Sequence, residues 1–324
     1  MAKKIGLDLG SDYTRISLDN GNLFRAPSVI VMDKYAETVA AAGTAARKML
    51  GKTPDHMEAI CPIRGGVIAN GTACSDMLRA FFEQTDAGTN LDVVVAVPGG
   101  ITAMEESNLR QAVFAANVKH VTLVDATICA AIGSGLQFRD VRGSMIVDLG
   151  GGQSRAAVVS LADVARFSSV ASGGDEMDMT IVNYLKETKN VVIGLQIAEY
   201  LKRQIGSTQS GTGSATVIGQ DVNGGGIRAL EITTADIKNA ISGHVSRIVN
   251  LINKTLSMTP PELCADIGDH GIMLTGGISC MHGIGQTLQE RIKVRVTRAK
   301  EPQDVIIRGI RQIIQSGKEA EYGR

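Results

Sequence analysis

The chain has 324 residues, equal numbers of acidic and basic residues, and 44% hydrophobic residues. A formal net charge of zero provides no basic field to attract a phosphate backbone, and aromatic residues at 3%, without tryptophan, offer little surface on which bases could stack. We therefore expect no nucleic-acid partner. At roughly 150 residues per domain, the length predicts about two domains.

Cysteine and histidine usage argues against a metal centre or a disulfide framework. The five cysteines are scattered without a CxxC pair, and the five histidines form no HExxH or Cys/His cluster. The first residues, 1–4, lead directly into an apolar strand without a signal-peptide pattern, and no apolar run approaches about 20 residues. We expect a cytoplasmic protein.

Strands and helices alternate in the first half of the chain. In chain order, we predict strands over residues 4–9 and 15–18, helices over 36–50 and 75–84, and a strand over 91–97. The last of these is a nearly continuous β-branched run, typical of a strand buried on both faces. Thr102 and Glu105 then have the spacing of a capping box, which predicts a helix extending to residue 117.

The pattern restarts near the middle of the chain. An apolar strand over 144–147, an Asp-Leu-Gly turn and a second strand over 155–161 repeat the opening unit about 140 residues later, which indicates an internal duplication. The remaining predicted elements are a strand over 121–124, helices over 127–135, 181–206, 233–256 and 304–316, a hairpin within 207–232, and a strand over 271–274. This alternation predicts an α/β fold.

Three glycine turns, at residues 8–11, 148–152 and 274–277, each follow an apolar strand. Glycine lets the backbone approach a phosphate, and successive N–H groups can form an anion-binding nest. The first two turns also place an acid, Asp8 or Asp148, beside the nest. A carboxylate next to a phosphate is repulsive unless a cation lies between them, which predicts Mg²⁺ held largely through water. Neither a P-loop motif nor a GxGxxG dinucleotide motif is present.

Taken together, these motifs resemble the MreB family, the bacterial actins of the actin, DnaK-type chaperone and sugar-kinase superfamily. The three turns match its phosphate 1, phosphate 2 and adenosine motifs, and residues 127–135 match its connecting helix. Further matching stretches lie at 27–29, 48–51, 66–69, 97–98, 100–102, 130–133, 174–178 and 204–206.

The resemblance implies an α/β actin-like fold, with two duplicated RNase-H-like lobes, a nucleotide cleft between them and smaller inserted subdomains. The boundaries that we expect are 1–27, 75–141 and 310–324 for the first core lobe (IA), 28–74 for its insertion (IB), 142–180 and 243–309 for the second core lobe (IIA), and 181–242 for its insertion (IIB).

The resemblance also implies a site for ATP or ADP with Mg²⁺. Asp8 and Asp148 would face the waters of the metal, and Gly276 and Gly277 would let the adenosine lie against backbone. Lys202 would flank the base or ribose, with a solvated helix lysine as the alternative. The residues whose backbone N–H groups would hold the phosphates are Gly10, Ser11, Asp12, Tyr13, Gly150, Gly151 and Gly152.

Departures from the family pattern affect all three glycine turns. The family has Thr-Ala-Asn-Thr after its first Asp-Leu-Gly, and this chain has residues 11–14 as Ser-Asp-Tyr-Thr. The carboxylate of Asp12 should weaken phosphate binding unless it points away. In the second loop, Gln153, Ser154 and Arg155 replace Thr-Thr-Glu, and Ile278 replaces a common third glycine of the adenosine turn.

A further departure concerns hydrolysis. The family has Glu-Glu-Pro before the connecting helix, and the glutamate beside the proline orients the attacking water; here Ala126 occupies that position. The adjacent Asp125 should face away from the phosphate, because consecutive residues leaving a strand point to opposite sides. Gln153 is the candidate substitute, since an amide can orient water. We expect weak or absent ATPase activity.

The function that we expect is a cytoskeletal subunit that forms head-to-tail homopolymers for cell shape or intracellular positioning, with shape-complex or positioning proteins as partners. A non-polymerising nucleotide switch or adaptor, a degenerate paralogue, is the alternative; a kinase of the superfamily is less favoured, because the chain lacks its larger insertions. Direct membrane binding should be weak or absent, since no N-terminal amphipathic extension is seen and the loop 83–90 has little to bury in lipid.

Overall fold

The computed structural model describes residues 3–88 and 90–323, which separate into two compact units. Unit 1 comprises Met1–Val141, Leu161–Val164 and Gln303–Arg324, and unit 2 comprises Arg142–Ser160 and Ala165–Pro302. Residues 161–164 and 303–309, which the resemblance assigns to the second core lobe, belong to unit 1. The finer division into four subdomains stays a prediction. Met1, Ala2 and Thr89, on which part of the membrane expectation falls, lie outside the described residues.

Unit 1 is built on a five-stranded sheet in the order β10-β9-β1-β2-β3. These strands are β1 (Lys3–Leu9), β2 (Tyr13–Ser17), β3 (Leu23–Pro27), β9 (Leu91–Val97) and β10 (Val118–Asp125). Strand β1 pairs in parallel with β9 and antiparallel with β2. The consecutive burial of β9 from Val93 to Val97 confirms that this strand is covered on both faces.

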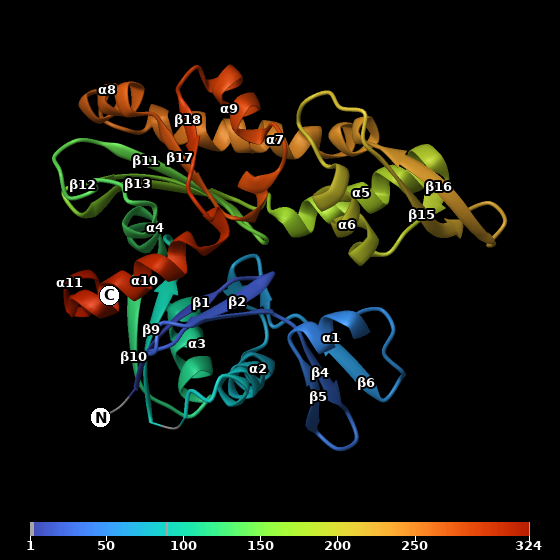
Figure 1. Cartoon of the computed structure of the whole chain (residues 1–324), viewed down its shortest axis with the longest axis horizontal. Helices are drawn as coiled ribbons and strands as arrows, with labels where there is room; N and C mark the ends of the chain where they lie inside the picture. Colours follow the sequence, from blue (N-terminus) through green and yellow to red (C-terminus); the bar gives the residue numbers. More distant parts are fainter. Residues whose placement is uncertain (1–2, 89, 324) are drawn as a thin grey trace. The chain divides into compact units, whose positions relative to one another are not determined.

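Helices cover both faces of this sheet. They are α2 (Gly71–Gln84), α3 (Ala103–Phe114), α4 (Ala126–Ser134), α10 (Val305–Ser316) and the short α11 (Glu319–Tyr322), with a 3₁₀ turn, η2 (Pro302–Asp304), before α10. Figure 1 shows α2 and α3 on one face and α4 with α10 on the other. The predicted capping box between Thr102 and Glu105 is confirmed at the start of α3. Gly133 and Gly309 let α4 and α10 cross, since a Cβ on either would lie within 1.9 Å of the other helix's backbone.

The segment after β3 forms a small region of its own within unit 1. It contains β4 (Ile30–Asp33), β5 (Thr38–Ala42), α1 (Thr44–Met49), β6 (Met57–Ile60) and the hairpin β7 (Ile63–Arg64) with β8 (Val67–Ile68). The helix predicted over 36–50 is wrong in its first half, because Thr38–Ala42 is a strand that pairs antiparallel with β4. Pairing with a neighbouring strand outweighed the helical preference of alanine.

Unit 2 repeats the sheet of unit 1, which confirms the predicted duplication. Its order is β13-β12-β11-β17-β18, with β11 antiparallel to β12 and parallel to β17. The strands are β11 (Ser144–Leu149), β12 (Ser154–Ser160), β13 (Asp163–Val170), β17 (Ile272–Thr275) and β18 (Val296–Arg298).

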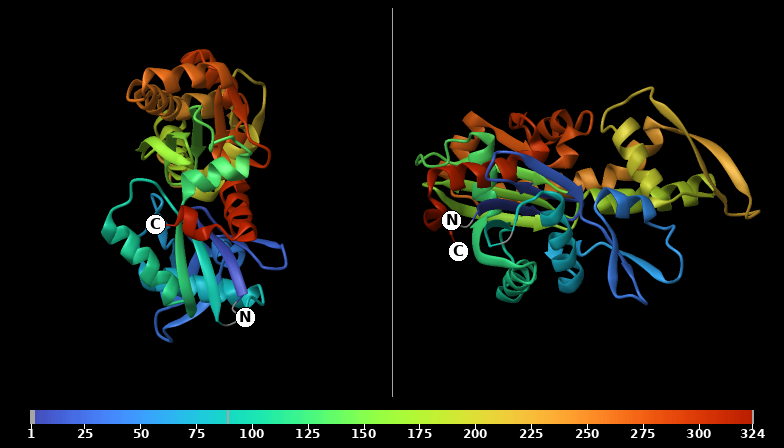
Figure 2. Two further views of the ribbon diagram at one scale, coloured as in Figure 1. Left: turned by 90° about the vertical axis from the view of Figure 1, so that its left-hand side faces the viewer. Right: turned by 60° about the horizontal axis from the view of Figure 1, so that its bottom comes forward.

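The other elements of unit 2 are helices around this sheet and an inserted hairpin. They are α5 (Gly174–Lys189), β14 (Val191–Val192), α6 (Leu195–Ile205), β15 (Ser214–Asp221), β16 (Ile227–Thr233), α7 (Thr234–Ser257), α8 (Pro261–His270), the 3₁₀ turn η1 (Gly277–Cys280) and α9 (Ile284–Ile292). The helix predicted over 181–206 is two helices, because Asn190 takes a left-handed conformation that ends α5. The hairpin β15–β16 projects beyond α5 and α6 (Figure 2).

Each unit has its own hydrophobic core. In unit 1 the core gathers around β1, β9 and α2, and in unit 2 around β11, α5 and α7. In the part of the chain that the structure describes, no helix is long and apolar enough to cross a membrane.

Candidate functional site

The first two glycine turns are closed by the same hydrogen bond, one in each unit. In unit 1 the Gly10 N–H donates to the Tyr13 carbonyl over 3.2 Å, and in unit 2 the Gly150 N–H donates to the Gln153 carbonyl over 3.0 Å. Each turn joins a strand that carries the aspartate to the next antiparallel strand. The duplication therefore extends from the sheet order to the backbone of the turns themselves.

The turn of unit 1 is held by hydroxyl groups from the strands around it. The Ser28 hydroxyl donates to the Gly10 carbonyl over 2.6 Å and lies 2.9 Å from the Thr14 hydroxyl, and both side chains are fully buried. The Gly66 N–H, in the turn between β7 and β8, donates to the Ser11 hydroxyl over 3.0 Å. The stretch 27–29 is among those that resemble the family, but the sequence alone assigned Ser28 no role, because a single serine after a strand does not show what it contacts.

Asp12, the extra carboxylate of this turn, has a cation beside it. Its Oδ1 lies 2.6 Å from the Arg47 Nη1 of helix α1. The Arg47 guanidinium also lies over the Tyr13 ring, 5.4 Å from the ring centroid. The charge that should weaken phosphate binding is thus balanced locally.

The turn of unit 2 is held by the beginning of helix α5. The backbone N–H groups of Gly174 and Asp175 donate to the Gly150 and Gly151 carbonyls over 3.1 and 2.9 Å. Bonds from the first turn of a helix fix the carbonyls of the loop and satisfy N–H groups that have no partner within the helix. The loop and the start of the helix therefore form one hydrogen-bonded feature.

Lys202 lies beside this feature and is not a solvated helix lysine. Its Nζ donates to Asp178 Oδ2 and to the Gly174 carbonyl, each over 2.7 Å. Burial raises the pKa of Asp178 to about 7, although the Lys202 ammonium opposes this shift. Lys202 is therefore an anchor that joins α6 to α5. Its expected contact with the base or ribose stays a prediction.

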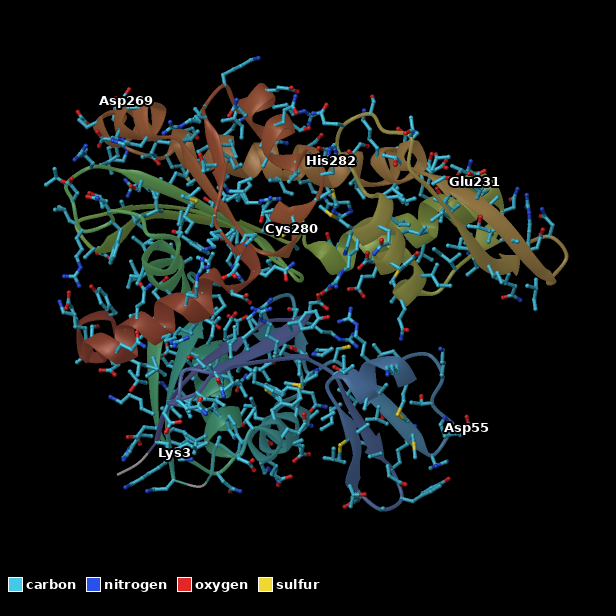
Figure 3. The ribbon with its side chains drawn as sticks, viewed as in Figure 1. Lys3, Asp55, Glu231, Asp269, Cys280 and His282 are labelled. Carbon is cyan, nitrogen blue, oxygen red and sulfur yellow. The ribbon has the colours of Figure 1, made fainter. Side chains whose placement is uncertain are left out.

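The third turn lies against the second in unit 2. Gly276 has φ 82°, and a Cβ there would lie 2.6 Å from Asp148 Oδ1 and 2.4 Å from the Leu149 carbonyl. Only glycine allows this approach. The segment that follows is tied to the loop after α6, because the His282 Nδ1 and the Ser207 hydroxyl lie 3.0 Å apart (His282 is labelled in Figure 3). The predicted turns at 148–152 and 274–277 thus meet at Asp148.

The two aspartates expected near the metal each face an arginine across the hairpin. Asp8 Oδ2 lies 3.7 Å from Arg15 Nη1, and Asp148 Oδ2 lies 3.6 Å from Arg155 Nη1. Within the described ranges, no group of three or more His, Cys, Asp or Glu residues could ligate a metal directly. The roles of Asp8 and Asp148 beside Mg²⁺ stay a prediction.

At the start of helix α4, the position of the expected catalytic glutamate carries only a methyl group. Ala126 is the first residue of α4, and the Asp125 carboxylate before it accepts the Thr127 N–H over 2.7 Å. Asp125 therefore serves as the helix cap. The negative charges of Asp125 and Asp8 both contribute to raising the pKa of Cys129, after the larger effect of burial. In unit 2, the Gln153 backbone closes the turn as described; the role of its side chain stays a prediction.

Known bacterial proteins match both the sequence and the architecture of this chain. A family model described as MreB/Mbl protein matches residues 2–322. The cell shape-determining protein Mbl of Bacillus subtilis (strain 168) is 33% identical over 314 residues, covering 95% of this chain and 94% of that protein. The cell shape-determining protein MreB of Escherichia coli (strain K12) is 34% identical over 316 residues, covering 94% and 91%.

Solved structures give the same result for the fold. The crystal structure of MreB5 of Spiroplasma citri bound to AMPPNP has a TM-score of 0.94 at 27% identity, covering 99% of this chain and 98% of that chain. A MamK double helical filament has a TM-score of 0.82 at 19% identity, covering 97% and 99%. The fold is the actin-like fold that the sequence predicted.

Proposed function

We propose that this chain, which belongs to the MreB/Mbl family, has the cytoskeletal role of a bacterial actin. It binds ATP or ADP with Mg²⁺ and polymerises into filaments. The observation that carries the proposal is the pair of equivalent turns, each closed by the same hydrogen bond and each following an aspartate. A backbone nest with an acid beside it suits a phosphate whose charge is shared with a cation.

The nucleotide proposal draws further support from a relative. MreB5 of Spiroplasma citri is bound to AMPPNP in one crystal structure and to ADP in another. In our proposal Gly10 to Tyr13 and Gly150 to Gly152 supply N–H groups to the phosphates, and Gly276 and Gly277 receive the adenosine. Asp8 and Asp148 would orient the waters of Mg²⁺, which supplies counter-charge to the phosphates when bound.

Self-association is the second part of the proposal. MamK, which shares the fold, is seen as a double helical filament. A head-to-tail contact between different surfaces of two copies does not close and therefore extends into a filament. The proposal also includes shape-complex or positioning proteins as partners of the filament.

We propose that hydrolysis is attenuated, because Ala126 has no group that can hold a water in line with a phosphate. The same substitution favours a second candidate function, a nucleotide switch or adaptor that does not polymerise. The two functions differ in a single observable, the formation of polymer.

Two measurements on the purified chain test the proposal. Calorimetric titration with ATP and Mg²⁺ should show binding at one site, and absence of binding would overturn the nucleotide site. Sedimentation with ATP and Mg²⁺ at micromolar protein should show polymer, with electron microscopy to identify filaments. Monomer throughout a broad range of salt and nucleotide would favour the switch.

A further inference from the structure

The two Asp–Arg pairs occupy the same register in the two units. Asp8 on β1 lies opposite Arg15 on β2, and Asp148 on β11 lies opposite Arg155 on β12. Directly opposed residues of an antiparallel pair share one face of the sheet. Each carboxylate that is proposed to orient the waters of Mg²⁺ therefore already has a guanidinium within 3.7 Å.

The two arginines differ in their other contacts. Arg15 donates through Nε to Asp304 Oδ1 over 3.0 Å, and this buried carboxylate also pairs with Arg25. The charge of Arg15 is thus shared between Asp8 and Asp304, both of unit 1. Within the described residues, Arg155 pairs with no second carboxylate, and its Nε is buried without a hydrogen-bond partner. A buried N–H without an acceptor is costly, so the hydrogen-bonding capacity of Arg155 is less fully satisfied than that of Arg15.

Arg155 also acts on a carboxylate that lies where two of the glycine turns meet. Asp148 Oδ1 accepts from the Thr275 hydroxyl over 3.3 Å, and a Cβ on Gly276 would lie 2.6 Å from the same oxygen. On the other side, a Cβ on Gly150 would lie 3.9 Å from Oδ2. The positive charge of Arg155 is therefore held against the residues that are proposed to receive the nucleotide.

We propose that Arg155 supplies part of the positive charge that balances the nucleotide phosphates, so that nucleotide binding by this chain persists when Mg²⁺ is removed. This inference rests on the proposed nucleotide site. A guanidinium is always charged and presents several N–H donors suited to phosphate oxygens. By pairing with Asp148, it also reduces the negative charge that this carboxylate offers to a metal. Arg155 stands where the family pattern has a glutamate, so the sign of the charge at this position is reversed.

The test measures ATP binding by calorimetry in two buffers, one with Mg²⁺ and one with EDTA. The wild-type chain should bind in EDTA with a Kd within about tenfold of its value with Mg²⁺. Arg155→Gln should raise the Kd in EDTA by about tenfold or more, with a smaller effect when Mg²⁺ is present. Arg291→Gln, the same change of charge on the exposed surface of α9, is the matched control and should equal wild type in both buffers.

Arg155→Lys keeps the charge and should bind in EDTA more tightly than Arg155→Gln, which separates charge from folding; thermal melting without nucleotide checks that each variant is folded. Loss of wild-type binding in EDTA, with binding intact in Mg²⁺, would overturn the inference and leave the proposed site standing. An equal increase of the Kd for Arg155→Gln in both buffers would also overturn the inference and leave the proposed site standing. Absence of ATP binding by the wild-type chain in both buffers would overturn the proposed function and this inference with it.

Discussion

The Arg47 guanidinium lies 2.6 Å from the Asp12 carboxylate and so joins helix α1 to the first glycine turn. The pair is partly buried, where a charge pair is screened less than at the surface. Asp12 follows Ser11, and Arg47 also covers the ring of Tyr13. The turn therefore carries a carboxylate close to its proposed phosphate-binding N–H groups, and its charge is balanced by a residue 35 positions away.

Removing the Arg47 side chain should weaken nucleotide binding, because the negative charge of Asp12 then loses the cation beside it. We expect Arg47→Ala to raise the Kd for ATP by several-fold, because the unbalanced Asp12 carboxylate would repel phosphate. The double variant Asp12→Ala/Arg47→Ala should recover most of the loss, as measured by calorimetry. Lys48→Ala, on the exposed side of the same helix, serves as the control. No recovery in the double variant would show that Arg47 acts by packing instead.

Asp148 should matter for nucleotide binding only through the metal. With Mg²⁺ present, we expect Asp148→Ala to weaken ATP binding several-fold, up to the roughly tenfold that Mg²⁺ contributes, because the waters of the ion lose a charged acceptor. In EDTA the same variant should bind no more weakly than wild type. Asp269→Ala, on the exposed surface of α8, is the control. Equal affinity of wild type and Asp148→Ala in Mg²⁺ would contradict the proposed role.

Restoring a carboxylate at the start of α4 should accelerate hydrolysis. We expect slow phosphate release from the wild-type chain under polymerising conditions and a rate higher by about tenfold or more for Ala126→Glu, because a carboxylate can position and polarise water. Gln153→Ala is measured alongside. If Ala126→Glu leaves the rate unchanged and Gln153→Ala abolishes a substantial wild-type rate, the water is held by Gln153 and our assignment is wrong.

The buried His244 should make unit 2 less stable in mild acid. Its ring lies 2.8 Å from the Thr180 hydroxyl and 3.0 Å from the Ser172 hydroxyl. Burial, with the nearby charges of Arg247 and Lys202, lowers the pKa of His244 to about 4. The unfolded chain takes up this proton near the usual pKa of 6.5, so the stabilisation present above 6.5 is lost as the pH falls towards 4.

Between pH 7 and 5 this loss amounts to about 2 kcal/mol in the free energy of unfolding. Asp178, with its pKa raised to about 7, acts in the opposite direction over the same interval. Urea unfolding of wild type and His244→Gln at both pH values separates the contribution of His244 to the free energy of unfolding from that of Asp178. The variant should show the smaller loss on acidification, and exposed His270→Gln should behave as wild type. Equal losses in wild type and His244→Gln would refute the prediction.

Direct attachment to lipid should be weak. The loop 83–90 is polar, and of its described residues only Ala87 is buried in the protein. Such a loop has little apolar surface to transfer into a bilayer. Flotation with neutral liposomes, without any partner, should leave the protein at the bottom of the gradient. Robust flotation would contradict this expectation.

Much of the fold was predictable because its signals are local. The apolar runs of β1, β9 and β11, the capping box of α3 and the repeated Asp-Leu-Gly turn each depend on residues that are close in sequence. The helix predicted over 36–50 was wrong because Thr38–Ala42 forms a strand that depends on β4. Its alanines are compatible with either structure, and only the neighbouring strand decides between them.

The sequence by itself determined the duplicated α/β architecture, the family, and which turns are candidates for phosphate, because glycine and aspartate at fixed spacing restrict the backbone directly. Only the tertiary structure decided how the charges of the candidate site are balanced. Arg47 meets Asp12, Lys202 meets Asp178, and Arg155 meets Asp148. The first two pairs bring together residues that are far apart in sequence, and the third depends on the register between β11 and β12. Electrostatic balance depends on distance in space, so spacing along the chain could reveal the carboxylates but not their partners.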